Sequence, residues 1–317
     1  MLKSRRWLVL LLAASLAAGL CSGCVPSAGS QGGTVAAVDA AGAEVELPKN
    51  PQRVAVLFSS LADIWVTAGG TVAVTVGESV ERGFAGEDAV LVDSGAGKSI
   101  DTERLIDAGP DLVLCSADIE AQCDAAEICR QAGIPTAALR VECFEDYLDV
   151  LHLFTELTGE SGRFETYGTQ VQARIEALKE SFAGSAQAQK ILFIRAGSTA
   201  GATKAKTARE HFACAMLQEL GTENIADQAP VLLDGLSFEE VLRQDPDCIF
   251  IATMGDERAA KDYMNSVLEE PAWQSLTAVQ QGRVAYLPKE LFQYKPNARW
   301  DEAYEYLIDL LTADVQP

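Results

Sequence analysis

Residues 101–114 read DTERLIDAGPDLVL, and residues 237–250 read SFEEVLRQDPDCIF, which is the same pattern. Each stretch begins with a residue that can cap a helix, Asp101 or Ser237, and has a glutamate two positions later. Each then places Pro-Asp before an apolar run, and proline ends a helix and favours an extended start to the next element. The chain therefore contains one short helix–strand unit twice, which predicts two similar halves.

Short apolar runs alternate with helical patterns on both sides of these units, which is typical of a parallel α/β sheet. Between residues 143 and 183 apolar residues recur at helical spacing, and no strand is expected. We therefore predict an α/β fold with two Rossmann-like lobes, residues 38–142 and 184–317, joined by connecting helices over 143–183. The predicted strands are 53–58, 71–76, 89–92, 111–115, 136–141, 190–195, 247–253 and 283–288.

Glu103 and Glu239 occupy equivalent positions in the first turns of the two predicted helices. The helix dipole favours an acid in a first turn, and this explains either glutamate taken alone. The matched pair has a second interpretation. One acid on each lobe, equivalently placed, suits docking to two similar partner subunits.

Residues 93–99, DSGAGKS, resemble part of a phosphate-binding loop. The complete motif needs a glycine at the position of Val92, which falls inside a predicted strand. The following helix is expected to begin at Asp101 rather than at Lys98, so its amides would not face a phosphate held by Lys98. We therefore do not expect nucleotide binding here.

The first 23 residues have the pattern of an export signal, in which Lys3, Arg5 and Arg6 precede the apolar run WLVLLLAASLAAGL. LCSGC (20–24) resembles a lipoprotein signal-peptidase site with Cys24 as the lipidated residue, although Cys21 stands where an aliphatic residue is usual. Residues 24–37 are then expected to form a flexible tether. Simple secretion is the alternative, and both place the protein outside the cytoplasm.

Removal of residues 1–23 leaves 22 of the 25 Lys and Arg residues against 46 Asp and Glu, a net charge of about −24. This charge does not favour nucleic acid or anionic lipid as a partner. Six cysteines follow Cys24, and none has the CxxC spacing of a zinc site. Cys115 and Cys143, near predicted strand ends, are the candidate disulfide pair; free thiols are the alternative.

Several segments together resemble the class III solute-binding proteins of ABC importers, which carry ferric siderophores, haem or cobalamin. VDAAGAEVELPKNPQRVAVL (38–57) resembles the opening hairpin and first strand of that family, and LGTENIAD (220–227) and PAWQSLTAVQQGRVAYLP (271–288) resemble segments of its second lobe. The repeated units resemble its two docking segments, with Ser99 and Asp101-Thr102 in place of the usual Pro and Asn-Leu. The resemblance implies a periplasmic binding protein fold with a ligand cleft between the lobes, at the carboxyl ends of the strands.

The resemblance also implies a set of partners. Glu103 and Glu239 correspond to the acids that pair with arginines on the two subunits of an ABC permease, which works with a cytoplasmic ATPase. The protein would be a monomer without enzymatic activity or intrinsic cofactor, attached to the membrane only through its lipid anchor. Its ligand would be a small-molecule metal complex, a ferric chelate in the first place and cobalamin or haem as alternatives.

Candidate ligand contacts lie at predicted strand ends and in the loops beside them. They are Ser59, Ser60, Trp65, Arg82 and Lys98 in the first lobe and Arg195, Lys204, Lys206, Met254, Tyr294 and Arg299 in the second, with Phe58, Arg209, Thr253 and Lys295 beside them. Cations gathered in so acidic a chain suit an anionic ligand. The alternatives are solvated charges, strand-end ion pairs and a core role for the tryptophan. Met254 or His211 could also ligate the iron of haem.

Two other functional classes remain open. An exported hydrolase would need a catalytic base, and His152 falls in an apolar helical stripe where we expect it to be buried. DGLSFEE (234–240) lacks the second glycine of a serine-hydrolase elbow. A surface receptor that senses a ligand with the same fold is the other class.

Overall fold

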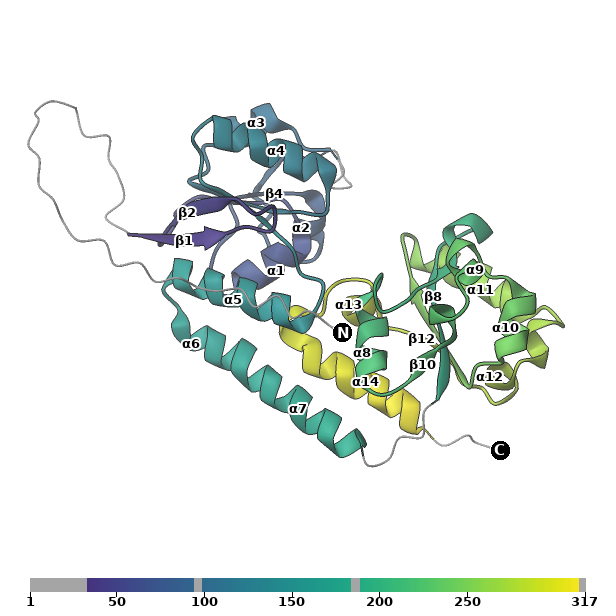
Figure 1. Ribbon diagram of the computed structural model, residues 1–317. Helices are drawn as coiled ribbons and strands as arrows, with labels where there is room; N and C mark the ends of the chain where they lie inside the picture. The colour runs from purple at the N-terminus through teal and green to yellow at the C-terminus, as the bar shows by residue number, and fades with distance from the viewer. Residues whose placement is uncertain (1–32, 94–98, 184–188, 314–317) are drawn as a thin grey trace, which may run out of the picture. The chain divides into compact units, whose positions relative to one another are not determined.

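The computed structural model describes residues 33–93, 99–183 and 189–313 (Figure 1). The predicted signal peptide, Cys24, residues 24–32 of the predicted tether and Lys98 lie outside these residues. From Gly33 onward the chain forms one unit. Within the described part of the chain, no helix is both long enough and apolar enough to cross a membrane.

The N-terminal lobe contains a five-stranded sheet in the order β5-β4-β3-β6-β7, and every pairing in it is parallel. Successive residues of β3 face opposite sides: Val54 and Val56 pack with α1, whereas Ala55 packs with α3 and α4. A run of apolar residues is therefore buried on both faces, as in other parallel sheets. The strands are β3 (Val54–Val56), β4 (Val74–Thr75), β5 (Val90–Leu91), β6 (Leu112–Ser116) and β7 (Thr136–Leu139). The helices are α1 (Ser59–Thr67), α2 (Gly77–Glu81), α3 (Thr102–Asp107) and α4 (Glu120–Gln131).

The C-terminal lobe contains a second sheet, in which β10-β8-β11-β12 are parallel and β9 pairs antiparallel with β8. Its strands are β8 (Lys190–Ala196), β9 (Lys204–Ala205), β10 (Glu223–Asn224), β11 (Cys248–Thr253) and β12 (Val284–Tyr286). Its helices are α8 (Phe212–Glu219), α9 (Val231–Asp234), α10 (Phe238–Gln244), α11 (Glu257–Leu268), α12 (Thr277–Gln280) and α13 (Lys289–Phe292), with 3-10 turns at Ala200–Ala202, Ile225–Asp227 and Trp273–Ser275. The predicted α/β fold with two Rossmann-like sheets is confirmed.

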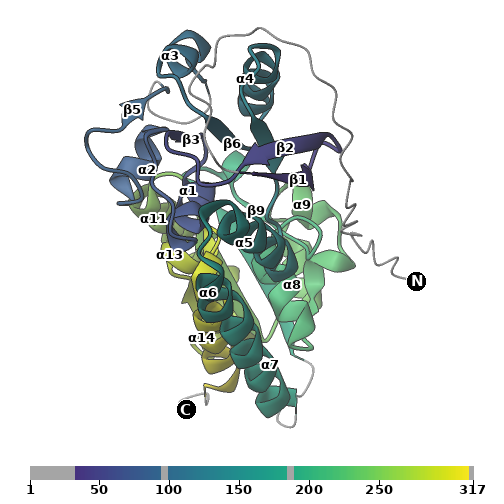
Figure 2. The same cartoon turned by 90° about the vertical axis from the view of Figure 1, so that its left-hand side faces the viewer.

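Helices link the two sheets, as predicted. They are α5 (Phe144–Thr158), α6 (Ser161–Phe164), a π-helical turn (Glu165–Thr169) and α7 (Gln170–Ala183). The last helix, α14 (Trp300–Thr312), follows the 3-10 turn η5 (Asn297–Arg299) and packs beside α7, as Figures 1 and 2 show. Its Trp300 meets Phe144 of α5 and Phe212 of α8 edge to face. One face of each sheet thus belongs to a single core shared with the connecting helices.

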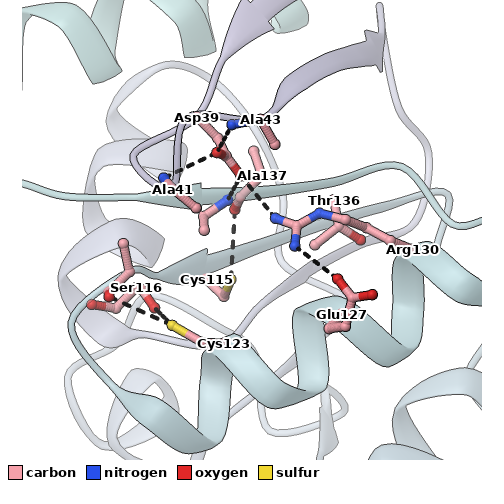
Figure 3. Close-up of polar contacts among 12 residues, drawn as sticks. Asp39, Ala41, Ala43, Cys115, Ser116, Cys123, Glu127, Arg130, Thr136 and Ala137 are labelled. Carbon is pink, nitrogen blue, oxygen red and sulfur yellow. Dashed lines mark hydrogen bonds and ion pairs between the residues drawn. The ribbon is translucent and has the colours of Figure 1, made fainter.

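A β-hairpin precedes the first sheet, and β1 (Thr34–Val38) pairs antiparallel with β2 (Glu44–Pro48). The fully buried Asp39 follows β1 (Figure 3), where one carboxylate oxygen accepts hydrogen bonds from the amides of Ala41 and Ala43. The other oxygen accepts from Arg130 of α4, at 2.8 Å, and from the amide of Ala138 in β7. Asp39 therefore fastens the hairpin to the lobe. Because residues 34–37 belong to β1, the tether predicted for residues 24–37 extended too far.

The candidate disulfide between Cys115 and Cys143 is not formed, and all six cysteines of the described residues carry free thiols. Cys115 lies inside the first sheet, with Sγ near the carbonyl oxygen of Ala137, whereas Cys143 precedes the first turn of α5. Burial raises the pKa of each thiol to about 12. Both therefore stay protonated and unreactive at neutral pH.

Candidate functional site

The two helix–strand units seen in the sequence are α3–β6 and α10–β11, and their Pro-Asp aspartates make equivalent contacts. The Asp111 carboxylate accepts from the amide of Arg53 (2.9 Å), and the Asp111 amide donates to the Arg53 carbonyl (3.0 Å). The Asp247 carboxylate accepts from the amide of Lys190 (2.8 Å), and the Asp247 amide donates to the Lys190 carbonyl (2.8 Å). Each aspartate therefore anchors the start of the neighbouring strand, which gives this part of the repeat a structural explanation.

The helix starts of the two units differ. The Asp101 side chain accepts from the amide of Arg104 at 3.0 Å and caps α3, as predicted. Ser237 occupies the corresponding position at α10, but its hydroxyl caps no first-turn amide. The predicted capping role of Ser237 is therefore wrong.

Glu103 and Glu239 are both exposed, one in the first turn of α3 and one in the first turn of α10. Within the described residues neither carboxylate makes a hydrogen bond or an ion pair. The neighbouring Glu240, by contrast, is held by Arg243 at 2.5 and 2.9 Å and by Gln244. The two equivalent glutamates are thus free for a partner, and their docking role remains a prediction.

A cavity of about 230 Å³ lies between the carboxyl ends of strands from both sheets. In each sheet the strand order reverses at this point, between β3 and β6 and between β8 and β11, and such reversals are where parallel sheets bind ligands. The first lobe contributes the segment after β3 and a glutamate of α2. The second contributes strand ends, the residue before α8, and the end of α13 with the segment after it. The lining residues are Phe58, Ser59, Ser60, Glu78, Arg195, His211, Ala252, Thr253, Met254, Phe292, Gln293, Tyr294 and Lys295.

The N-terminal wall of the cavity is a chain of polar contacts. The Ser59 hydroxyl donates to the Glu78 carboxylate, and Arg82 donates to the Ser59 oxygen at 2.9 Å. The Arg82 guanidinium also stacks on the ring of Tyr294, 3.8 Å from its centroid. Burial lowers the pKa of Arg82, and the nearby charges of Asp63 and Glu78 oppose this effect. Glu78 was missed in the sequence, although its place directly after the strand predicted at 71–76 could have indicated it.

The C-terminal wall carries positive charge. Arg195 is half-buried and has no ion-pair partner among the described residues, and Lys295 lies 4.7 Å from the ring centroid of Phe212. Burial lowers the pKa of Lys295. Burial also lowers the pKa of His211 to about 3, assisted by the positive Lys295, Arg195 and Lys206. The imidazole is therefore neutral and accepts from the Ala213 amide through Nδ1.

Two further lining residues carry buried polar atoms without a hydrogen-bond partner in the described structure. They are the hydroxyl of Thr253, whose residue is 3% exposed, and the carbonyl oxygen of the Gln293 side chain. Buried polar atoms are nearly always paired in native proteins. A ligand or a water molecule in the cavity would supply the missing partners.

Several predicted contacts lie away from the cavity. Trp65 is 1% exposed, packs edge to face on Phe154 and donates to the Thr71 carbonyl, so it cannot touch a ligand and is corrected to a core residue. Arg299 pairs with Glu302 at 2.8 Å, and Lys206 pairs with Glu210 at 3.3 Å. The other candidates absent from the lining are Lys204, which lies in β9, and Arg209, which is exposed. Arg82 does not line the cavity itself, but it contacts two lining residues, Ser59 and Tyr294.

The structure brings the remaining candidates together. Ser59, Ser60, Arg195, Met254 and Tyr294 all line the cavity, and their contact with a ligand remains a prediction. The neighbouring candidates Phe58, Thr253 and Lys295 and the alternative haem ligand His211 line it too.

The expectation for His152 was wrong. It is exposed on α5, where its ring meets Phe164 edge to face. His152 follows the spacing of the apolar residues of α5 because its ring contacts Phe164 of α6, but the side chain stays exposed to solvent.

Comparisons with known proteins agree with this geometry. Residues 54–291 match a protein family described as periplasmic binding protein. No curated protein matches the chain at the level of sequence.

Solved structures with the same fold bind different ligands. SirA of Staphylococcus aureus, complexed with staphyloferrin B, is 18% identical with a TM-score of 0.68 over 89% of this chain and 100% of that one. The vitamin B12-binding protein BtuF of Vibrio cholerae is 19% identical with a TM-score of 0.67 over 83% and 98%. The heme-binding protein RhuT from Roseiflexus sp. RS-1, in apo form, is 18% identical with a TM-score of 0.65 over 82% and 97%. Identities this low establish the fold and no more.

Proposed function

The chain belongs to the periplasmic binding protein family, and from this premise we propose that it captures a ferric siderophore or a related iron complex for an ABC importer. The match to this family confirms the resemblance seen in the sequence. Members of the family bind substrates outside the cytoplasm and are not enzymes, which excludes the exported hydrolase. The protein delivers its cargo to a permease dimer that works with a cytoplasmic ATPase. It acts as a monomer attached to the membrane through a lipid on Cys24.

One observation carries the ligand part of the proposal. Both lobes line a single cavity, and one wall of it presents the unpaired Arg195 beside Lys295. A guanidinium recognises carboxylates through a planar pair of donors, and an ammonium adds a compact positive charge. The site therefore suits the anionic groups of a ferric chelate. SirA, complexed with staphyloferrin B, shows that the same fold can hold a siderophore.

Two observations support docking through Glu103 and Glu239. They occupy the same place in equivalent units of the two lobes, and both are exposed without partners in the described structure. We infer that each pairs with an arginine of one permease subunit. Because the mature chain carries about 24 net negative charges, a basic permease surface would also attract it at long range.

Haem is the second candidate ligand. His211 and Met254 line the same cavity, and both side chains can ligate haem iron. The heme-binding protein RhuT and the vitamin B12-binding protein BtuF have the same fold, so the fold is also compatible with haem and cobalamin.

Titration of the purified protein separates these ligands. We expect ferric citrate or ferric staphyloferrin B to quench its tryptophan fluorescence at lower concentrations than haemin or cyanocobalamin do. Protein purified from iron-replete medium should show a ferric-chelate spectrum rather than a haem Soret band. Tight binding of haemin with a Soret band would favour haem instead, and binding of none of the four would contradict the proposed function.

A matched pair of arginine variants tests the cavity. Arg195→Ala removes the unpaired guanidinium and should weaken the ferric carboxylate chelate about tenfold or more. Arg299→Ala removes a guanidinium that pairs with Glu302 outside the lining, so its affinity should stay at the wild-type value. Equal affinities for both variants would remove Arg195 from the binding site.

A further inference from the structure

Four residues between α13 and α14, Tyr294 to Asn297, contact the N-terminal lobe at both of their ends. At one end, the Arg82 guanidinium lies 3.8 Å from the centroid of the Tyr294 ring. At the other, the Asn297 side-chain amide donates to the carbonyl of Ser60 (3.0 Å) and to the carboxylate of Asp63 (2.8 Å). The segment 294–297, called the latch below, therefore joins the two lobes.

The Asn297 end of the latch is built as fixed structure. Asn297 is fully buried, and its φ of +50° is a left-handed conformation that asparagine tolerates better than most residues. Burial raises the pKa of its partner Asp63, and Arg82 and Arg299 lie close enough to oppose this effect. Of the three residues at this end, Ser60 lines the cavity and Asn297 and Asp63 do not. A ligand can therefore bind without touching the side chains of Asn297 and Asp63.

The Tyr294 end is exposed to the cavity. The ring of Tyr294 lies near two cations, with Arg82 of the first lobe at 3.8 Å and Lys289 of the second at 5.0 Å. Arg82 is also bonded to Ser59, and both Ser59 and Tyr294 line the cavity. Among the described residues, the ring thus covers the cation that the N-terminal wall could offer to an anion. A cation–π contact of this kind corresponds to about a two- to thirtyfold change in an equilibrium constant.

The small volume of the cavity indicates that the Tyr294 side chain moves when a ligand binds. Its volume of about 230 Å³ lies below the ~300–1,000 Å³ of most small-molecule sites. Rotation of the Tyr294 side chain away from Arg82 would enlarge the cavity and uncover the guanidinium at once. No such rotation is available at the buried Asn297 end.

We propose that residues 294–297 form a two-ended latch, in which Asn297 holds the lobes together permanently and Tyr294 releases Arg82 when an anionic ligand enters. The release step rests on the proposed function. The joining of the lobes does not, because it is a property of the ligand-free protein.

Hydrogen exchange of the ligand-free protein tests the joining of the lobes. Tyr294→Leu removes the aromatic ring that contacts Arg82. Asn297→Gly removes the side-chain amide, and glycine accepts the positive φ at this position. Each variant should speed hydrogen exchange of the backbone amides at the start of α1 about two- to thirtyfold. Tyr294→Phe keeps the ring and should exchange like the wild type. Wild-type exchange in both Tyr294→Leu and Asn297→Gly, at unchanged far-UV circular dichroism, would overturn the latch.

The association rate of ferric citrate, followed by stopped-flow fluorescence, tests the release. Tyr294→Leu should bind about two- to thirtyfold faster, because Arg82 is uncovered from the start. Asn297→Gly, which lies outside the lining, should bind at the wild-type rate, a separation that a merely structural loosening would not produce. Equal rates in the wild type, Tyr294→Leu and Asn297→Gly would overturn the release step. Failure of the wild type to bind ferric citrate would contradict the proposed function instead, and the exchange experiment would still decide the latch.

Discussion

The helix–strand units of the two lobes, α3–β6 and α10–β11, share some contacts and not others. Asp111 and Asp247 anchor the start of the adjacent strand through the same pair of backbone hydrogen bonds. The helix caps differ, because Asp101 accepts from a first-turn amide and Ser237 does not. Glu103 and Glu239 recur as exposed first-turn acids without a hydrogen bond or an ion pair in the described structure. The helix dipole favours each of them alone, and docking to a two-subunit partner would explain why they recur as a pair.

The surroundings of the units also differ between the lobes. The first lobe is closed by a hairpin that the buried Asp39 fastens through its ion pair with the partly exposed Arg130. The second lobe places a neutral histidine among three cations at the cavity. Because of these differences, substitutions at corresponding places in the two lobes should change stability by different amounts.

The largest effect is expected in the first lobe alone. Asp39→Ala leaves Arg130 without its buried partner and two hairpin amides without an acceptor, and it should lower the free energy of unfolding by about 3–5 kcal/mol. Glu127→Ala is the matched control, since this exposed glutamate lies 3.8 Å from the same arginine. It should change stability by less than about 0.5 kcal/mol. Urea unfolding measures both, and equal losses would show that Asp39 does not fasten the hairpin.

His211 should make stability depend on pH. The unfolded chain takes up a proton on this histidine below its ordinary pKa of 6.5, whereas the folded protein does so only near pH 3. Stability should therefore fall as the pH drops through this window, by about 2 kcal/mol between pH 6.5 and 5. His211→Asn keeps an acceptor for the Ala213 amide and should remove this part of the dependence. An unchanged pH dependence in His211→Asn would contradict the burial of a neutral imidazole; the exposed His152→Asn is the control expected to behave as wild type.

The two aspartates of the repeat, Asp111 and Asp247, should contribute unequally to the free energy of unfolding. Asp111→Ala removes acceptors for the amides of Gln52 and Arg53 and should cost about 2 kcal/mol. Asp247→Ala removes the acceptor for Lys190 alone and should cost about 1 kcal/mol. Unfolding by urea distinguishes the two, and a loss for Asp247→Ala as great as that for Asp111→Ala would show that the additional bond to the Gln52 amide adds no stability.

The smallest expected change in stability distinguishes the residues that precede α3 and α10, Asp101 and Ser237. Asp101→Ala should cost about 1 kcal/mol, because the amide of Arg104 loses its acceptor. Ser237→Ala should leave stability unchanged, because its hydroxyl caps nothing. The same cost in both variants would show that Ser237 caps α10 in solution.

Much of the fold could be predicted because local patterns determine it. Each predicted strand is present, since short apolar runs in an alternating α/β pattern have few other places to be buried. The Pro-Asp repeat was recognised for the same local reason. The tether was extended too far because TVAAV, residues 34–38, becomes a strand only by pairing with residues 44–48.

The site could be predicted only where strand ends determine it. Ser59, Ser60, Arg195 and Met254 follow or end strands, and all of them line the cavity. Trp65 was misassigned because the sequence does not show which face of α1 packs on Phe154. Asn297 was missed because its partners, Ser60 and Asp63, lie more than 230 positions away along the chain.

The most direct test of the account is iron uptake by cells that produce the double variant Glu103→Lys, Glu239→Lys, measured beside the affinity of the purified protein for ferric citrate. We predict that uptake falls to the level of cells without the protein while affinity stays within about twofold, since neither glutamate lines the cavity. A control with the same charge change, Glu156→Lys, Glu176→Lys, places lysines on exposed positions of the connecting helices and should transport normally. Normal uptake by the first double variant, or a loss of affinity equal to its loss of uptake, would contradict docking through these two acids.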